Sequence, residues 1–163
     1  MALPDIGAVI APFLERVPPE EQPLFVALAE RMAAERYRRW AALATDAEGR
    51  KALLACADRE EEIASAVEAL TPDAGTVQRA LLETNPSLPE INSNLFEGRP
   101  LADQWMIQAR GERLGAATWR AFAGRDEGAQ REVFERCARL EEASAEVLEA
   151  LLDGKPTGAA PGR

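Results

Sequence analysis

The chain of 163 residues carries 28 acidic and 19 basic side chains, so its formal net charge at neutral pH is −9. Such an acidic balance argues against nucleic acid and anionic membrane surfaces as partners, and it is compatible with cation binding. The chain contains no histidine. This absence excludes Ser-His and Cys-His nucleophile pairs, acid–base catalysis by imidazole and every metal site that needs a histidine ligand.

The N-terminal segment and the two cysteines favour a cytoplasmic protein. The first residues lack a basic leader and include Pro4 and Pro12, which makes a poor secretory signal. No apolar run approaches the ~18 residues that are needed to cross a bilayer. Cys56 and Cys137 do not form a CxxC motif, which favours a reducing compartment and argues against a zinc knuckle.

Helical periodicity runs through the first part of the chain. Apolar residues recur at helical spacing over residues 4–17 and predict a short leading helix, which two consecutive prolines end. A long helix is expected over about residues 20–46. Thr45 and Glu48 fit a capping box that opens the next helix, over about residues 48–70.

The middle of the chain predicts a long crossover. Residues 71–100 contain four prolines and several apolar side chains, with room for one short helix over about 76–84. The segment is too long for a tight turn and too apolar for a free linker, so we expect it to pack along the other helices. Two further long helices are expected, over about 101–124 and 127–152.

These elements predict a single all-α domain. Val, Ile and Thr are sparse, so strand-forming stretches are absent, and the length is sufficient to bury a core. The domain is expected over residues 1–152. The small and polar ending, residues 153–163, predicts a disordered tail.

The two halves of the chain match each other. Residues 30–41 align with 112–123, with the aromatic pairs at equivalent positions, and residues 56–70 align with 137–151, with eight identities in fifteen positions. Alanine- and glutamate-rich helices resemble one another by chance, but these identities include a rare cysteine. We therefore interpret the chain as a duplicated helical hairpin joined by the crossover, which makes the second and third long helices parallel.

One glutamate lies on the apolar face of each long helix, at matching positions of the repeat: Glu30, Glu60, Glu112 and Glu141. If all four faces are buried in one core, the four carboxyl groups must converge. A buried carboxylate without a partner costs several kcal/mol, and no Lys or Arg shares these faces. The four groups must therefore hold cations, share protons or open to water, unless the faces lie elsewhere than the periodicity indicates.

At these residues the chain resembles the ferritin-like superfamily, and its rubrerythrin branch most closely. That family has a glutamate followed seven residues later by an aromatic residue in its first and third helices, as Glu30 with Tyr37 and Glu112 with Trp119. Its second and fourth helices carry Glu-x-x-His. The resemblance covers about residues 20–152 and implies a ferritin-like four-helix bundle with a di-iron site.

The chain departs from this family at both metal-binding histidines. Ile63 and Ser144 occupy those positions, so the family's oxidase or peroxidase chemistry does not carry over directly. The remaining carboxylates are an oxygen-only ligand set, which suits hard cations. With the resemblance, this predicts iron or manganese as the metal. Cys56 and Cys137 are interpreted as small buried hydrophobic residues, as a replacement thiolate ligand or as a redox-active disulfide.

Two functions follow from these observations. The four retained glutamates favour a metal-binding protein with a histidine-free site in the bundle, with redox chemistry as an open property of that site. The two missing histidines favour instead a metal-free descendant that acts as a dimerising or partner-binding scaffold. A third hypothesis, a small-molecule binder that uses the cavity between the hairpins, has no supporting motif. None of the three identifies a substrate or decides whether the protein is an enzyme.

Overall fold

The computed structural model describes residues 2–155 and 157, and within them it contains seven α-helices and no strand. Four are long: α2 (Gln22–Leu43), α3 (Ala47–Glu68), α6 (Leu101–Ala123) and α7 (Gly128–Leu152). Three are short: α1 (Ile6–Leu14), α4 (Ala74–Thr84) and α5 (Leu88–Asn94). The predicted all-α class is confirmed. None of the described helices is both long and apolar enough to span a membrane.

The helix ends follow ordinary capping chemistry. Proline lies in the first turn of α2 and of α5, where the missing N–H has no intrahelical acceptor to lose. At the start of α3 the cap differs from the predicted capping box: the side chain of Asp46 accepts from the backbone N–H of Gly49 at 2.6 Å. The carboxylate of Asp46, rather than the hydroxyl of Thr45, therefore caps this helix.

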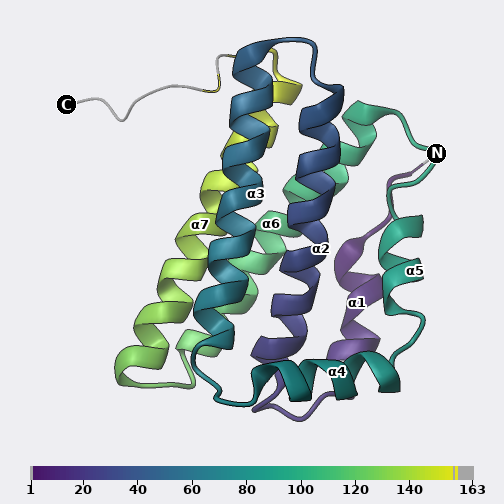
Figure 1. The fold of residues 1–163 in the computed structure, drawn as a ribbon. Coiled ribbons are helices and arrows are strands. Elements are labelled where there is room, and N and C mark those ends of the chain that lie inside the picture. Colours follow the sequence, from purple (N-terminus) through teal and green to yellow (C-terminus); the bar gives the residue numbers. More distant parts are fainter. Residues whose placement is uncertain (1, 156, 158–163) are drawn as a thin grey trace.

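The four long helices lie side by side as two hairpins (Figure 1). Helix α2 packs against α3, α6 packs against α7, and α3 packs against α7. These hairpins are the two halves of the predicted repeat. Helix α4 crosses one end of the hairpins and α5 returns alongside them, so α3 and α6 run in the same direction, as expected for a long crossover (Figure 1).

The crossover contains one more helix than the sequence predicted. The short helix expected over 76–84 is α4, whereas α5 was expected only as irregular chain. Pro89 occupies the first turn of α5, where proline is compatible with a helix. The predicted tail begins after α7, and its residues 156 and 158–163 lie outside the part of the chain that the structure describes.

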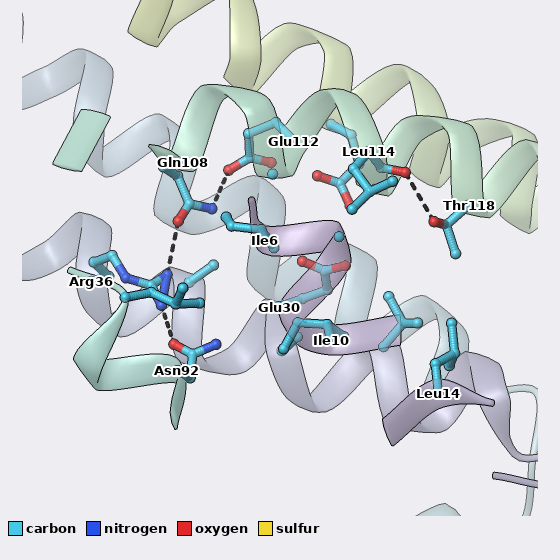
Figure 2. Close-up of a pocket in the computed structure, with 18 of the residues that line it drawn as sticks. Ile6, Ile10, Leu14, Glu30, Arg36, Asn92, Gln108, Glu112, Leu114 and Thr118 are labelled. Atoms are coloured by element: carbon cyan, nitrogen blue, oxygen red, sulfur yellow. Dashed lines mark hydrogen bonds between the residues drawn. The ribbon is translucent and has the colours of Figure 1, made fainter. Parts of the chain in front are cut away.

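Helix α1 lies beside α6 and covers a cavity between α2 and α6. Ile6, Ile10 and Leu14, which are spaced one turn apart, line this cavity (Figure 2). No residue of α1 is fully buried, although the helix is strongly apolar. The cavity therefore leaves the apolar face of α1 only half covered.

The core has two apolar clusters with the glutamates between them. One cluster includes Ala27, Ile63, Trp119 and Phe134, and the other includes Tyr37, Trp40, Leu53 and Leu148. The four glutamates predicted to face inward occupy helix positions between these two sets. The acidic layer therefore crosses the middle of the long helices, where the core is otherwise apolar.

Candidate metal site

Each of the four predicted glutamates is buried on its own long helix. Their exposed fractions are 7 % for Glu30, 0 % for Glu60, and 1 % for both Glu112 and Glu141. Acidic side chains are rarely so buried unless a partner compensates their charge. The interior position that the helical periodicity predicted is therefore confirmed for all four.

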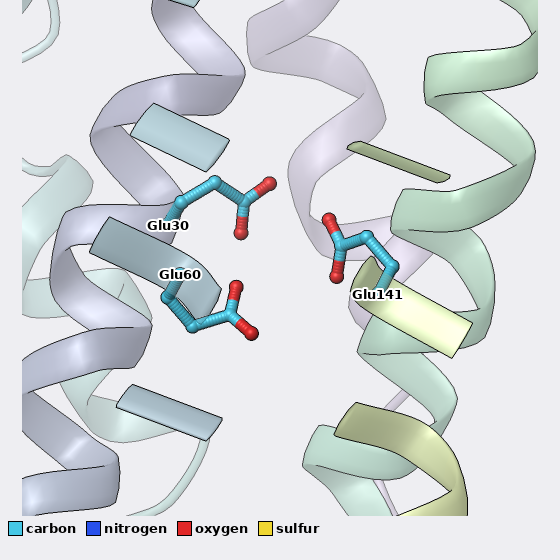
Figure 3. Close-up of side chains that lie close together, drawn as sticks. All are labelled: Glu30, Glu60 and Glu141. Carbon is cyan, nitrogen blue, oxygen red and sulfur yellow. The ribbon is translucent and has the colours of Figure 1, made fainter. Parts of the chain in front are cut away.

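Three of these glutamates form a compact cluster. Glu30, Glu60 and Glu141 each offer a carboxylate oxygen, and these oxygens all lie within 4.8 Å of one another. Figure 3 shows the three side chains extending from their helices toward a shared space. Two oxygens bound to one cation at about 2.0–2.6 Å can be at most about 4–5 Å apart, so this cluster could hold a metal ion.

Glu112 lies outside this group of three. Its Oε1 accepts a hydrogen bond from the Tyr37 hydroxyl at 2.6 Å and another from Nε2 of Gln108 at 2.7 Å. Both bonds hold the carboxyl group on the side of the cavity, which Glu30 and Glu141 also line. The structure thus brings three of the four predicted residues into one cluster and places the fourth beside it.

Within the described residues, the hydrogen bonds to Glu60 and Glu141 reach one oxygen of each carboxyl group. Ser144 donates to Oε1 of Glu60 at 3.0 Å, and Nε1 of Trp119 donates to Oε1 of Glu141 at 2.9 Å. Oε2 of Glu60 is fully buried and has no hydrogen-bond partner among the described residues. A buried acceptor without a partner costs about 1–3 kcal/mol, and more when it is charged, so this atom requires a proton or a cation.

Burial and mutual repulsion raise the pKa values of the cluster. Removal from water, followed by the negative charge of Glu112, raises the pKa of Glu30 to about 7. Burial also raises the pKa of Glu60 and of Glu141 well above the ordinary value, with further contributions from the neighbouring carboxylates. Without a cation, the cluster therefore retains protons at a pH where exposed glutamates have lost them.

A glycine provides the space that Glu141 occupies. A Cβ atom at Gly115 would lie 2.5 Å from Oε1 of Glu141, which is closer than real Cβ contacts. Gly115 lies on α6, three residues after Glu112 and one residue before a buried alanine. The sequence did not single out this glycine, because a lone glycine within a helix usually only lowers helix stability.

A buried arginine also belongs to this region, although it does not share the inward face of its helix. Arg36 is 5 % exposed, and its Nη1 donates to Oε1 of Gln108 at 2.9 Å. Its Nη2 donates to the side-chain oxygen of Asn92 on α5, and its guanidinium stacks on Phe96 at 3.7 Å. Arg36 was missed because it lies on the flank of α2, which is covered only in the folded protein, by the crossover and by Gln108 of α6.

The two cysteines are free and buried on opposite sides of the glutamate layer. Each lies one turn before a glutamate, but α3 and α7 run in opposite directions, so their Cα atoms are separated by about 12 Å along the axis. A disulfide requires less than about 7 Å, which argues against the proposed bond. Burial raises the pKa of both thiols to about 12, which opposes the thiolate form that a metal ligand needs.

The positions expected to hold histidine in the resembled family differ from each other. Ile63 is fully buried in an apolar cluster and contributes no ligand atom. Ser144 is fully buried and orients Glu60 through its hydroxyl. Comparisons with models of known protein families, with curated proteins and with solved structures found no match for this chain.

Proposed function

We propose that this protein is a ferritin-like four-helix bundle that binds metal ions through carboxylate oxygens in its interior. Glu30, Glu60 and Glu141 would supply the ligands, and Glu112 would add a fourth carboxylate at the edge of the site. The order of the helices, the direction of the crossover and the repeat-related glutamates all support this proposal.

The observation that carries the proposal is Oε2 of Glu60, which is buried and has no hydrogen-bond partner in the part of the chain that the structure describes. The carboxyl group to which it belongs is one of the three whose oxygens lie within 4.8 Å of one another. A bound cation would compensate both this oxygen and the repulsion among the carboxylates. Ser144 donates to Oε1 of Glu60 and Trp119 donates to Oε1 of Glu141, as groups that orient metal ligands do.

The donor set favours a hard cation. Carboxylates without imidazole or thiolate suit Mg²⁺, Ca²⁺ and Mn²⁺, and the family resemblance adds iron. We therefore propose manganese or iron as the metal. When bound, either metal would supply Lewis acidity and one-electron redox chemistry, while the protein residues bind it, orient the ligands and exclude water.

Elemental analysis of protein purified without a histidine tag tests this proposal. Protein expressed with added manganese or iron, then dialysed, should retain metal in a fixed ratio to protein. The double substitution Glu60→Gln and Glu141→Gln should abolish this retention, because it removes two ligand charges. Glu62→Gln with Glu142→Gln is the matched control, since these neighbouring residues are only partly buried and form surface ion pairs with Arg136 and Arg120. Equal metal content in the two double variants would contradict the proposal.

A second function, a metal-free scaffold, is favoured by the hydrogen bonds that already reach the carboxyl groups and by the missing histidines. In that case the cluster holds protons, and the substitution of Glu60 and Glu141 by Gln raises stability at neutral pH because it removes repulsion and desolvation. In the metal-bound case the same substitution lowers stability, because binding to the native state is lost. Thermal melts of wild type and variant, each with and without chelator, distinguish the two functions by the sign of the change.

A further inference from the structure

The cavity beneath α1 has the size of a ligand pocket and is lined mainly by apolar side chains. Its volume is about 410 Å³, within the range of about 300–1,000 Å³ for small-molecule sites. Ile6, Ile10 and Leu14 line one wall, and Phe25 lies on the opposite helix. Figure 2 shows the cavity extending along α1, with the carboxyl groups of Glu30 and Glu112 beside its middle.

The two ends of this cavity differ in polarity. At one end lie Arg36, Asn92 and Gln108, and at the other lie Leu14 and Thr118 (Figure 2). The hydroxyl of Thr118 bonds to the backbone oxygen of Leu114, so it offers no free donor hydrogen to the cavity. One end of the cavity is therefore cationic and the other is effectively apolar.

Arg36 has donors left for a ligand. A guanidinium carries five N–H groups, and those of Arg36 bond to the amide oxygens of Gln108 and Asn92. Arg36 is absent from the arginine–carboxylate pairs found within the described residues. Arg36 is 5 % exposed, and both of its hydrogen-bond partners are neutral amides. The carboxylate of Glu112 acts on Arg36 electrostatically, but it bonds to Gln108 and not to the guanidinium. The free N–H groups of the buried arginine therefore favour an anionic ligand.

We propose that this cavity binds a linear aliphatic carboxylic acid, with its carboxylate on Arg36 and its alkyl chain lying along Ile6, Ile10 and Leu14. The chain would cover the apolar face of α1, which the protein alone leaves half exposed. Each methylene group buried in this way contributes about 0.8 kcal/mol. The bound chain would pass directly beside the glutamate cluster.

Ligand binding in this cavity is a property separate from metal binding, and it is tested independently. Binding is measured by calorimetry with octanoate, octanol and octylamine, which share one alkyl chain and differ in the charge of the head group. Octanoate should bind about tenfold more tightly than octanol, which is the gain expected from a hydrogen bond to a charged group. Tightest binding of octylamine would show that the glutamates set the preference, and it would overturn the proposal, as would equal binding of octanoate and octanol.

Variants at the two ends locate the ligand. Arg36→Met should weaken octanoate about tenfold and leave octanol unchanged, whereas Arg36→Lys should keep the preference for octanoate. Thr118→Trp fills the apolar end and should weaken octanoate about tenfold by expelling two methylene groups. Ala117→Trp is the control, because residue 117 is exposed on the same helix and does not line the cavity.

The possible results distinguish failure of the cavity proposal from failure of the metal-site proposal. Unchanged octanoate binding in folded Arg36→Met, or equal effects of the two tryptophan variants, would refute the cavity proposal. If Arg36→Met fails to fold, as judged by its thermal melt, the three wild-type ligands and the Thr118→Trp comparison still decide. Each titration is made twice, once on chelator-treated protein and once on manganese-loaded protein. Octanoate binding by protein that takes up no metal would refute the metal site alone, and metal uptake without octanoate binding would refute the cavity alone.

Discussion

Glu30 should make the free energy of unfolding fall as the pH rises, whereas most carboxyl groups in folded proteins have the opposite effect. The substitution Glu30→Gln tests this pH dependence. In chelator-treated protein, burial and the charge of Glu112 raise the pKa of Glu30 to about 7 from the ordinary glutamate value of 4.5. Between these values the folded protein holds a proton that the unfolded chain has released. The free energy of unfolding therefore falls as the pH rises through this interval.

The size of this effect follows from the two pKa values. Each pH unit between them corresponds to about 1.4 kcal/mol, so ionisation of Glu30 costs the fold about 3 kcal/mol by pH 8. Gln has nearly the same shape and no charge to desolvate. Glu30→Gln should therefore have little effect at pH 4.5 and should raise the free energy of unfolding by about 3 kcal/mol at pH 8, which is about 6–12 °C in Tm for a chain of this length.

Thermal and urea unfolding from pH 4.5 to pH 8 measures this difference directly. Glu35→Gln serves as the control, because Glu35 is exposed on the same helix and its surface pair with Arg38 contributes little at any pH. A gain that does not change with pH, or a loss at pH 8 in the presence of chelator, would refute the reasoning. In protein loaded with metal at about 1,000 times its Kd the sign should reverse, since binding then stabilises the wild-type native state by about 4.1 kcal/mol, which exceeds the gain of about 3 kcal/mol in the variant.

Three further predictions concern the groups around the cluster. Gly115→Ala should displace the carboxyl group of Glu141 and weaken manganese binding about tenfold in calorimetry, whereas Gly75→Ala, where a Cβ meets open space, should leave binding unchanged. Tyr37→Phe should lower the free energy of unfolding by about 1–2 kcal/mol in urea, because Glu112 loses a buried donor; an unchanged midpoint would show that water replaces the hydroxyl. The two buried thiols should react with a thiol reagent only after unfolding, and rapid reaction of the native protein would contradict their burial and raised pKa.

The sequence alone was sufficient to predict where the long helices lie and that the four glutamates are buried. The period of 3.6 residues is a local property, so it can be read without knowledge of which helices are neighbours. It predicted the four long helices to within about three residues at each end, and it placed Glu30, Glu60, Glu112 and Glu141 on the inward faces. The missing histidines likewise excluded imidazole from any ligand set here.

Tertiary packing decided what these faces contact. Glu112 differs from its repeat equivalent Glu30 because Tyr37 and Gln108 reach it from two helices, and no local pattern encodes both contacts. The burial of Arg36 depends on α5, which lies far along the chain and closes over the flank of α2. Helical periodicity shows which side of a helix is apolar. Whether the flank of that side is exposed to solvent, lines a cavity or is buried in the core depends on segments distant in sequence.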